Sequence, residues 1–80
     1  MINMATKRQS PTYLFCLKNT GYAASLESRK VYRAIPDPAA TARGFVRIID
    51  ESGEDYLYPA NRFVPVELPI AARRTLARAA

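Results

Sequence analysis

Four carboxylates stand within six residues of this chain, inside the segment "IIDESGEDYLYP" that covers residues 48–59. Paired carboxylates can carry out acid–base catalysis or bind a hard cation, but both tasks need a cleft or an enclosing loop. Their spacing does not follow the alternating ligand positions of an EF-hand calcium loop. We therefore expect a solvated turn that keeps a hairpin tip soluble, with docking of a basic partner segment as the functional alternative. The four residues are Asp50, Glu51, Glu54 and Asp55.

Tyrosines accompany these acids and would supply the aromatic part of a binding surface. Tyr56 and Tyr58 fall on one face of an extended segment and Leu57 on the other, and we expect Leu57 to point into the core. Together with Tyr32, the two tyrosines and the four acids make up the predicted surface for a protein partner. In the alternative interpretation, the tyrosine rings pack along the rim of the core and only their hydroxyl groups are wet.

The net charge of +5 raises the possibility of nucleic-acid binding. Residues 10–68 contain equal numbers of basic and acidic residues, so the excess positive charge comes from the two ends of the chain. A neutral body argues against a dedicated nucleic-acid-binding domain. The alternative prediction is weak binding in which arginines contact phosphates beside Tyr32 and Tyr58. These arginines are Arg33, Arg43, Arg47, Arg62, Arg73, Arg74 and Arg78.

Several reaction classes are excluded by composition. The chain contains no histidine, which removes Ser-His-Asp and Cys-His mechanisms and histidine-ligated metal sites. The three glycines are too far apart to form a phosphate-binding loop. Cys16, the only cysteine, stands within an apolar segment and is interpreted as a buried hydrophobic residue. We therefore expect no enzymatic activity, no metal site and no cofactor.

The expected compartment is the cytoplasm. A single cysteine cannot form an internal disulfide, so nothing points to an oxidising environment. No apolar run approaches the roughly 20 residues that span a bilayer, and we expect no membrane association.

The elements that must position these residues are mostly strands. Segments rich in apolar, aromatic or alternating residues, each ended by Pro, Gly, Asn or Asp, predict strands. Gly53 allows a tight connection between two of them, so residues 45–59 are predicted to form a β-hairpin. Pro65 lacks a backbone donor, which assigns the last strand to an edge of the sheet. The predicted strands cover residues 12–17, 29–35, 45–50, 55–59 and 63–68.

The remaining segments have turn or tail composition. In "PDPAATARG" (36–44), Asp37 can cap a short helix, Pro38 suits its first position and Gly44 can end it. Residues 59–62 are predicted to form a 3₁₀-like turn. We expect residues 1–11 to be a disordered leader, residues 12–69 to form one domain, and residues 70–80 to be a frayed helix or a disordered tail.

This order of elements is typical of a small SH3-like barrel of about five strands. The segments "YLFCLKNTGYAASLESRKVYRAIPDP" and "VRIIDESGEDYLYPANRFVPVELP" also resemble a group of small uncharacterised bacterial proteins with an SH3-like fold. The resemblance covers roughly residues 13–69 and is carried by "SLE..K.Y", "IIDESGEDYLYP" and "F.P.EL". It implies a fold and no activity. Members of that group tend to carry Gly at the position of Arg29.

The expected function is that of a non-enzymatic interaction or accessory module. Tyrosines beside carboxylates would resemble the surface on which SH3 domains bind Pro-rich peptides that contain arginine, although this chain has no tryptophan and no "ALYDY" signature. An unidentified protein partner is the first expectation, weak nucleic-acid binding is the alternative, and a monomer is favoured over a dimer.

Overall fold

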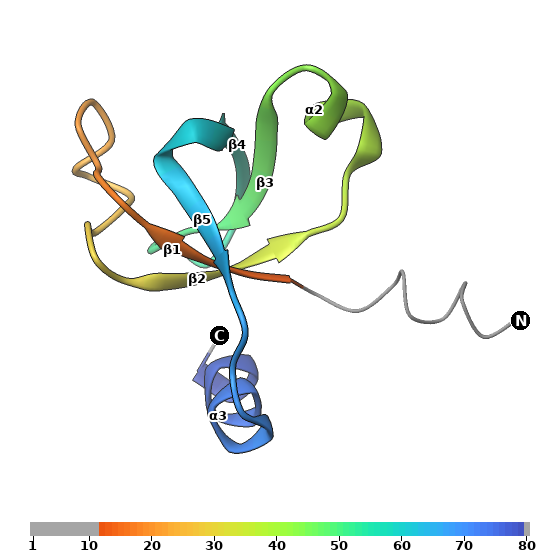
Figure 1. Cartoon of the computed structure of the whole chain (residues 1–80). Coiled ribbons are helices and arrows are strands. Elements are labelled where there is room, and N and C mark those ends of the chain that lie inside the picture. Colours follow the sequence, from red (N-terminus) through yellow and green to blue (C-terminus); the bar gives the residue numbers. More distant parts are fainter. Residues whose placement is uncertain (1–11, 80) are drawn as a thin grey trace, which may run out of the picture.

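Five antiparallel strands form one open sheet in the order β4-β3-β2-β1-β5. The computed structural model describes residues 12–79 of the chain, with side chains through residue 76. The first and last strands are neighbours, and both ends of the sheet curve toward the same side (Figure 1). The mainly β prediction is therefore confirmed. The strands are β1 (Thr12–Cys16), β2 (Val31–Ile35), β3 (Phe45–Ile49), β4 (Asp55–Pro59) and β5 (Phe63–Val66).

The predicted turns form for the reasons expected from their residues. Asp37 Oδ1 accepts a hydrogen bond from Ala40 N at 3.0 Å and caps helix α2 (Pro38–Ala42). Gly44 and Gly53 have φ values of +85° and +87°, which L residues with side chains adopt at a cost. A 3₁₀ turn, η1 (Ala60–Arg62), joins β4 to β5.

Arg29 has a φ of +66°, a left-handed backbone conformation that favours glycine. Its backbone N–H nevertheless donates to Cys16 O at 2.7 Å, so this turn also fixes the start of β2 against the end of β1. The resemblance drawn from the sequence places a glycine at this position.

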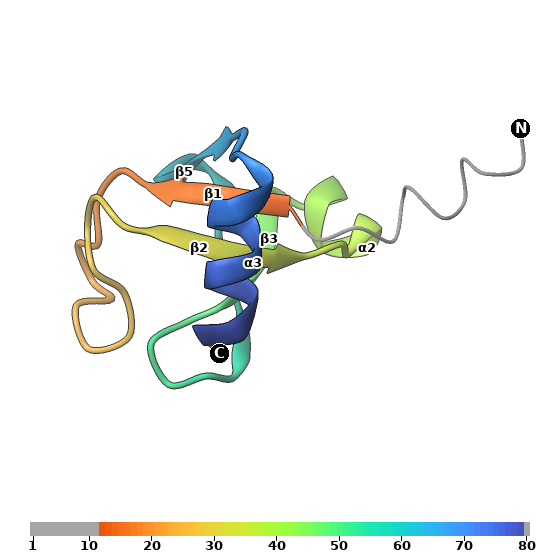
Figure 2. The same ribbon diagram turned by 90° about the horizontal axis from the view of Figure 1, so that it is seen from below.

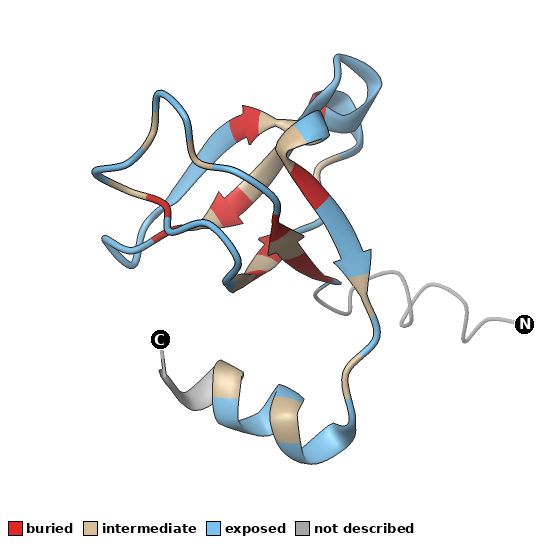
Figure 3. Cartoon of the chain, turned by 60° about the vertical axis from the view of Figure 1, so that its left-hand side comes forward, coloured by how far each residue is buried: buried red, intermediate tan, exposed pale blue. Residues whose placement is uncertain are grey.

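The core lies on one face of the sheet and is closed by the loop between β1 and β2 (Figure 3). Leu26, in that loop, is completely buried, as are Ile48 and Cys16. Burial of Cys16 confirms the interpretation of its thiol as a core group. The core cluster consists of Leu14, Cys16, Leu26, Tyr32, Ala34, Ile48, Tyr58 and Phe63.

The opposite face of the sheet is partly covered by helix α3 (Ile70–Ala79), which passes beneath β1 and β2 (Figures 1 and 2). The Tyr13 side chain is buried on this face, and its hydroxyl donates to Arg73 O at 3.5 Å. No helix in residues 12–79 is long and apolar enough to cross a membrane. The predicted leader, residues 1–11, lies outside the described residues.

Candidate protein-interaction surface

The acidic turn was predicted to be solvated, but the carboxylate of Asp50 is buried. Asp50 is 6% exposed, and its Oδ2 accepts a hydrogen bond from the Tyr58 hydroxyl at 2.5 Å. Its Oδ1 accepts from Ser52 N at 2.9 Å and from Ser52 Oγ at 2.6 Å. The tyrosine hydroxyl also lies 2.8 Å from Ser25 Oγ in the β1–β2 loop. A buried carboxylate with several donors orders its surroundings, so Asp50 holds the hairpin tip against β4 and this loop.

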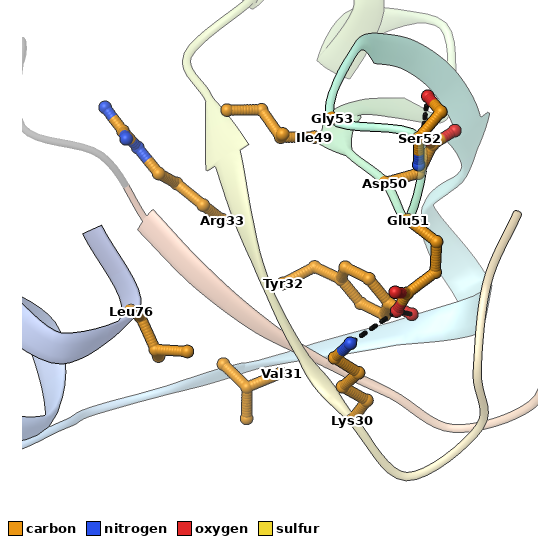
Figure 4. Close-up of a pocket in the computed structure, with 10 residues that line it drawn as sticks. All are labelled: Lys30, Val31, Tyr32, Arg33, Ile49, Asp50, Glu51, Ser52, Gly53 and Leu76. Atoms are coloured by element: carbon orange, nitrogen blue, oxygen red, sulfur yellow. Dashed lines mark hydrogen bonds and ion pairs between the residues drawn. The ribbon is translucent and has the colours of Figure 1, made fainter. Parts of the chain in front are cut away.

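Glu51 makes a second link of the same kind (Figure 4). Its Oε2 accepts from the Tyr32 hydroxyl at 2.5 Å and lies 2.6 Å from Lys30 Nζ. The tyrosine oxygen in turn accepts from Glu27 N at 2.7 Å. Glu51 N donates to Ser25 O, which binds the hairpin tip to the β1–β2 loop through the backbone as well. We call the Tyr58–Asp50 and Tyr32–Glu51 pairs the tyrosine–carboxylate clasp.

The clasp shifts the ionisation of its members. Burial alone raises the pKa of Asp50, but the hydrogen bonds from Ser52 and Tyr58 outweigh it and hold this pKa below its ordinary value. The bond from Lys30, followed by the bond from Tyr32, lowers the pKa of Glu51. The pKa values of both clasp tyrosines are raised, first by burial and then by the carboxylate that each contacts. At neutral pH the clasp is therefore two neutral tyrosines donating to two carboxylates.

Two predictions about side-chain orientation are wrong. Leu57, which was expected in the core, is 44% exposed, whereas Tyr58 is buried on the core side of β4. Tyr32 is also buried, so it cannot act as an exposed aromatic contact. The alternative interpretation describes the packed rings of both residues, but their hydroxyl groups, which it expected to be wet, donate to Glu51 and Asp50 instead. Among the predicted tyrosines only Tyr56, at 52% exposure, presents its ring to solvent.

The exposed part of the hairpin lies beside a hollow of about 400 Å³, which we call the edge hollow. Tyr56 forms one wall, and its hydroxyl donates to Glu54 Oε1 at 3.2 Å. Tyr22, from the β1–β2 loop, packs edge-to-face against the Tyr58 ring at 5.1 Å between centroids. The lining side chains are those of Tyr22, Ser25, Asp50, Ser52, Tyr56, Leu57 and Tyr58.

A second hollow, of about 360 Å³, lies on the other face of β4, between α2 and the hairpin strands; we call it the outer hollow. Phe45 and Leu57 provide apolar surface there and are 38% and 44% exposed. Arg47 is held between two carboxylates, with Nε 2.8 Å from Asp37 Oδ2 and Nη1 2.9 Å from Asp55 Oδ2. The predicted acid Asp55 is thus committed to an internal ion pair.

The predicted nucleic-acid contacts do not assemble into one free basic face. Arg47 is paired as described, and Arg62 donates to Thr20 O at 2.6 Å and stacks on the Tyr22 ring. Arg33 points away from the hairpin tip in Figure 4, and its buried Nε has no partner among the described residues. Arg73 and Arg74 are exposed on α3, while the side chain of Arg78 lies outside the described residues. This leaves Arg43, which is exposed just after α2, and the α3 arginines as the accessible cations of the alternative.

The β1–β2 loop was left out of the predicted surface. Ser25 reaches the hairpin only through tertiary contacts, and the segment "GYAASLES" has no periodicity that would reveal it. A local signal did exist for Asp50, because Asp followed two residues later by Ser is a typical Asx turn, in which the carboxylate accepts the backbone N–H.

The described residues contain no group of three or more His, Cys, Asp or Glu side chains placed to hold a metal ion. The hairpin presents one exposed tyrosine and borders two mainly apolar hollows, both lined in part by Leu57. No family model, curated protein or solved structure matches this chain.

Proposed function

We propose that this protein is a non-catalytic protein-interaction module whose partner surface is the exposed side of the β3–β4 hairpin with the edge hollow. The proposal keeps Glu54 and Tyr56 of the predicted surface and adds Leu57 and Tyr22. Tyr32, Asp50, Glu51 and Tyr58 become the supports of this surface, because they form the clasp beneath it.

We also propose that the sheet is an SH3-like barrel related to the small bacterial proteins that the sequence resembles. A meander in which β5 returns to pair with β1, with a 3₁₀ turn directly before β5, supports this assignment. The lone reduced cysteine supports a cytoplasmic setting. The lack of histidine and the internal use of most hairpin carboxylates support a role without catalysis.

The observation that best supports the interaction module is that aromatic and apolar side chains are exposed on a hairpin whose conformation is fixed by the clasp. Tyr56 and Leu57 are about half exposed, although both stand next to the clasp that fixes the hairpin. Ordering a binding surface before the partner arrives lowers the entropic cost of association. Tyrosine is also a frequent anchor in protein interfaces, since it combines a large rigid ring with a polar end.

The experiment is capture of partners from nuclease-treated cell lysate by the immobilised protein. The test variant is Tyr56→Ser, which removes an exposed ring without touching the β3–β4 backbone ladder. The control is Ile70→Ser, which removes an apolar side chain that is 62% exposed on α3, away from the hairpin. We expect Tyr56→Ser to lose a partner that wild type and Ile70→Ser retain.

Equal recovery by all three proteins would contradict the proposal. Partners that are captured from untreated lysate but lost after nuclease treatment would instead favour the nucleic-acid alternative. In that case binding should weaken steeply with salt and upon substitution of Arg73 and Arg74 by alanine.

A further inference from the structure

The outer edge of β4 carries unused backbone hydrogen-bonding groups. Ala60 N donates to Gly44 O at 2.9 Å, and Asp50 N donates to Glu54 O at 3.0 Å, so both ends of the β3–β4 ladder are fixed. Hydrogen-bonded and non-hydrogen-bonded pairs alternate in an antiparallel ladder. With the register Arg47 opposite Leu57, the backbone groups of Leu57 and Asp55 therefore point away from β3, where the sheet order ends.

The other outer strand, β5, is less able to accept a new strand. Leu17 N donates to Arg62 O at 2.7 Å, and by the same alternation Val64 and Val66 bond to β1. Pro65 then occupies the outward-facing position in the middle of β5, where it has no N–H to offer. The sequence prediction that Pro65 belongs on an edge is confirmed, and β4 is the edge left with free donors.

The two hollows lie on the two faces of this free edge. Tyr56 and Tyr58 point to the face of the edge hollow, and Leu57 points to the face of the outer hollow beside Phe45. Successive side chains of any strand added to β4 would point alternately to these two faces. Main-chain bonds to Asp55 and Leu57 would supply affinity, and the two hollows would select apolar side chains at alternate positions.

Charge identifies the residue expected at one end of such a segment. Asp55 is paired with Arg47, which it shares with Asp37, whereas Glu54 is exposed, and among the described side chains its carboxylate accepts only from the Tyr56 hydroxyl. A basic residue of the added segment would form an ion pair with the Glu54 carboxylate at this end of β4. A second copy of the chain fits less well, because two chains that each carry a net charge of +5 repel one another.

We propose that an extended segment of a partner protein adds to the free edge of β4 as a sixth strand, with apolar side chains at alternate positions and a basic residue beside Glu54. The inference rests on the proposed function and specifies how the partner binds. In this binding mode the partner is held by backbone hydrogen bonds to Asp55 and Leu57 and not only by side-chain contacts in the hollows.

The probe is a displayed library of unstructured nine-residue peptides selected on the wild-type protein, from which single binders are synthesised. Binding is measured by NMR titration, and hydrogen exchange of the backbone amides is compared with and without peptide. We expect the Leu57 and Asp55 amides, which face solvent in the free protein, to become protected in the complex. This measurement needs no variant and therefore does not depend on a mutant folding.

Two variants of the same residue then separate backbone from side chain. Leu57→Pro removes the outward N–H without breaking a β3–β4 bond, and Leu57→Thr keeps it. Leaving one buried peptide carbonyl without a donor should weaken binding about tenfold in Leu57→Pro relative to Leu57→Thr.

The outcomes distinguish the two proposals. Loss of binding in Tyr56→Ser, with unprotected Leu57 and Asp55 amides and equal affinity in both Leu57 variants, would overturn strand addition and leave the interaction module standing. A library without binders, or binders insensitive to every one of these changes, would overturn both. Selected peptides without a basic residue, or a doubled mass in sedimentation without peptide, would overturn the occupant that we propose.

Discussion

Replacing Tyr58 by phenylalanine removes one oxygen from the centre of the clasp and leaves the ring in place. The ring contacts with Tyr22 and Phe63, at 5.1 and 6.4 Å between centroids, do not involve the hydroxyl. What is lost is the 2.5 Å hydrogen bond to Oδ2 of Asp50, a residue that is 6% exposed, together with the 2.8 Å contact with Ser25 Oγ. The effect on stability therefore reports the polar contacts of the hydroxyl, chiefly the one with the carboxylate, and not a cavity.

The expected loss is about 2 kcal/mol in the free energy of unfolding. A hydrogen bond to a charged group contributes about 1.5–3 kcal/mol, and a buried acceptor left without its donor loses the full benefit. The lower half of that range applies, because Ser52 still donates twice to Oδ1 of Asp50. For a chain of this length, 2 kcal/mol corresponds to a fall in Tm of about 10 °C.

The assay is thermal unfolding followed by circular dichroism at pH 7, with Tyr56→Phe as the matched control. The Tyr56 hydroxyl contacts Glu54 at 3.2 Å, and Tyr56 is half exposed although it lies on the same face of the strand, so removal of its hydroxyl should leave the Tm unchanged. In Tyr58→Phe the pKa of Asp50, measured by NMR, should also rise, since one bond that stabilises the charged form is gone. Equal Tm values for the two variants, with an unchanged Asp50 pKa, would refute the role that we assign to the clasp.

Three further predictions concern the described residues. Arg29→Gly should stabilise the protein by up to about 1 kcal/mol, because it relieves a φ of +66° at the cost of a more flexible unfolded chain; chemical denaturation that shows a loss of stability would contradict this. Folding lowers the pKa values of Asp50 and Glu51, so their stabilising contribution is complete above about pH 5 and is lost as the pH falls through the folded values. The raised tyrosine pKa values act in the opposite direction: their contribution is complete below about pH 10 and is lost as the pH rises from there through the folded values, so Tm plotted against pH should show a plateau between about pH 5 and pH 10. The Cys16 thiol is completely buried, and burial raises its pKa, so a thiol reagent should modify it only at the rate of unfolding; rapid modification of the native protein would place it elsewhere.

Much of the backbone could be predicted from local sequence because the relevant residues act locally. Asp37 caps the first backbone N–H groups of a helix, and Pro38 suits the first helical position, so these two residues favour a helix start by themselves. Gly44 and Gly53 adopt positive φ without a steric penalty. Pro65 cannot donate a backbone hydrogen bond in any fold, which restricts it to an edge. The absence of histidine likewise excluded whole classes of catalysis without reference to a structure.

The direction of each face depends on partners far along the chain. Alternation in "DYLYP" predicts that Leu57 and Tyr58 point to opposite faces of the sheet. Because Leu and Tyr are both apolar enough to be buried, the pattern does not say which of the two faces is the buried one. The loop that carries Ser25 and Leu26 closes one face and thereby decides that Tyr58 is inside. Asp50 is buried for the same reason, since its charge becomes tolerable only when Tyr58 and Ser52 donate to it together. The short helix, the tight turns and the edge position of Pro65 were thus determined by the sequence alone. Which side chains of the hairpin are exposed was decided by tertiary contacts, because a buried carboxylate such as that of Asp50 requires donors that local sequence does not place.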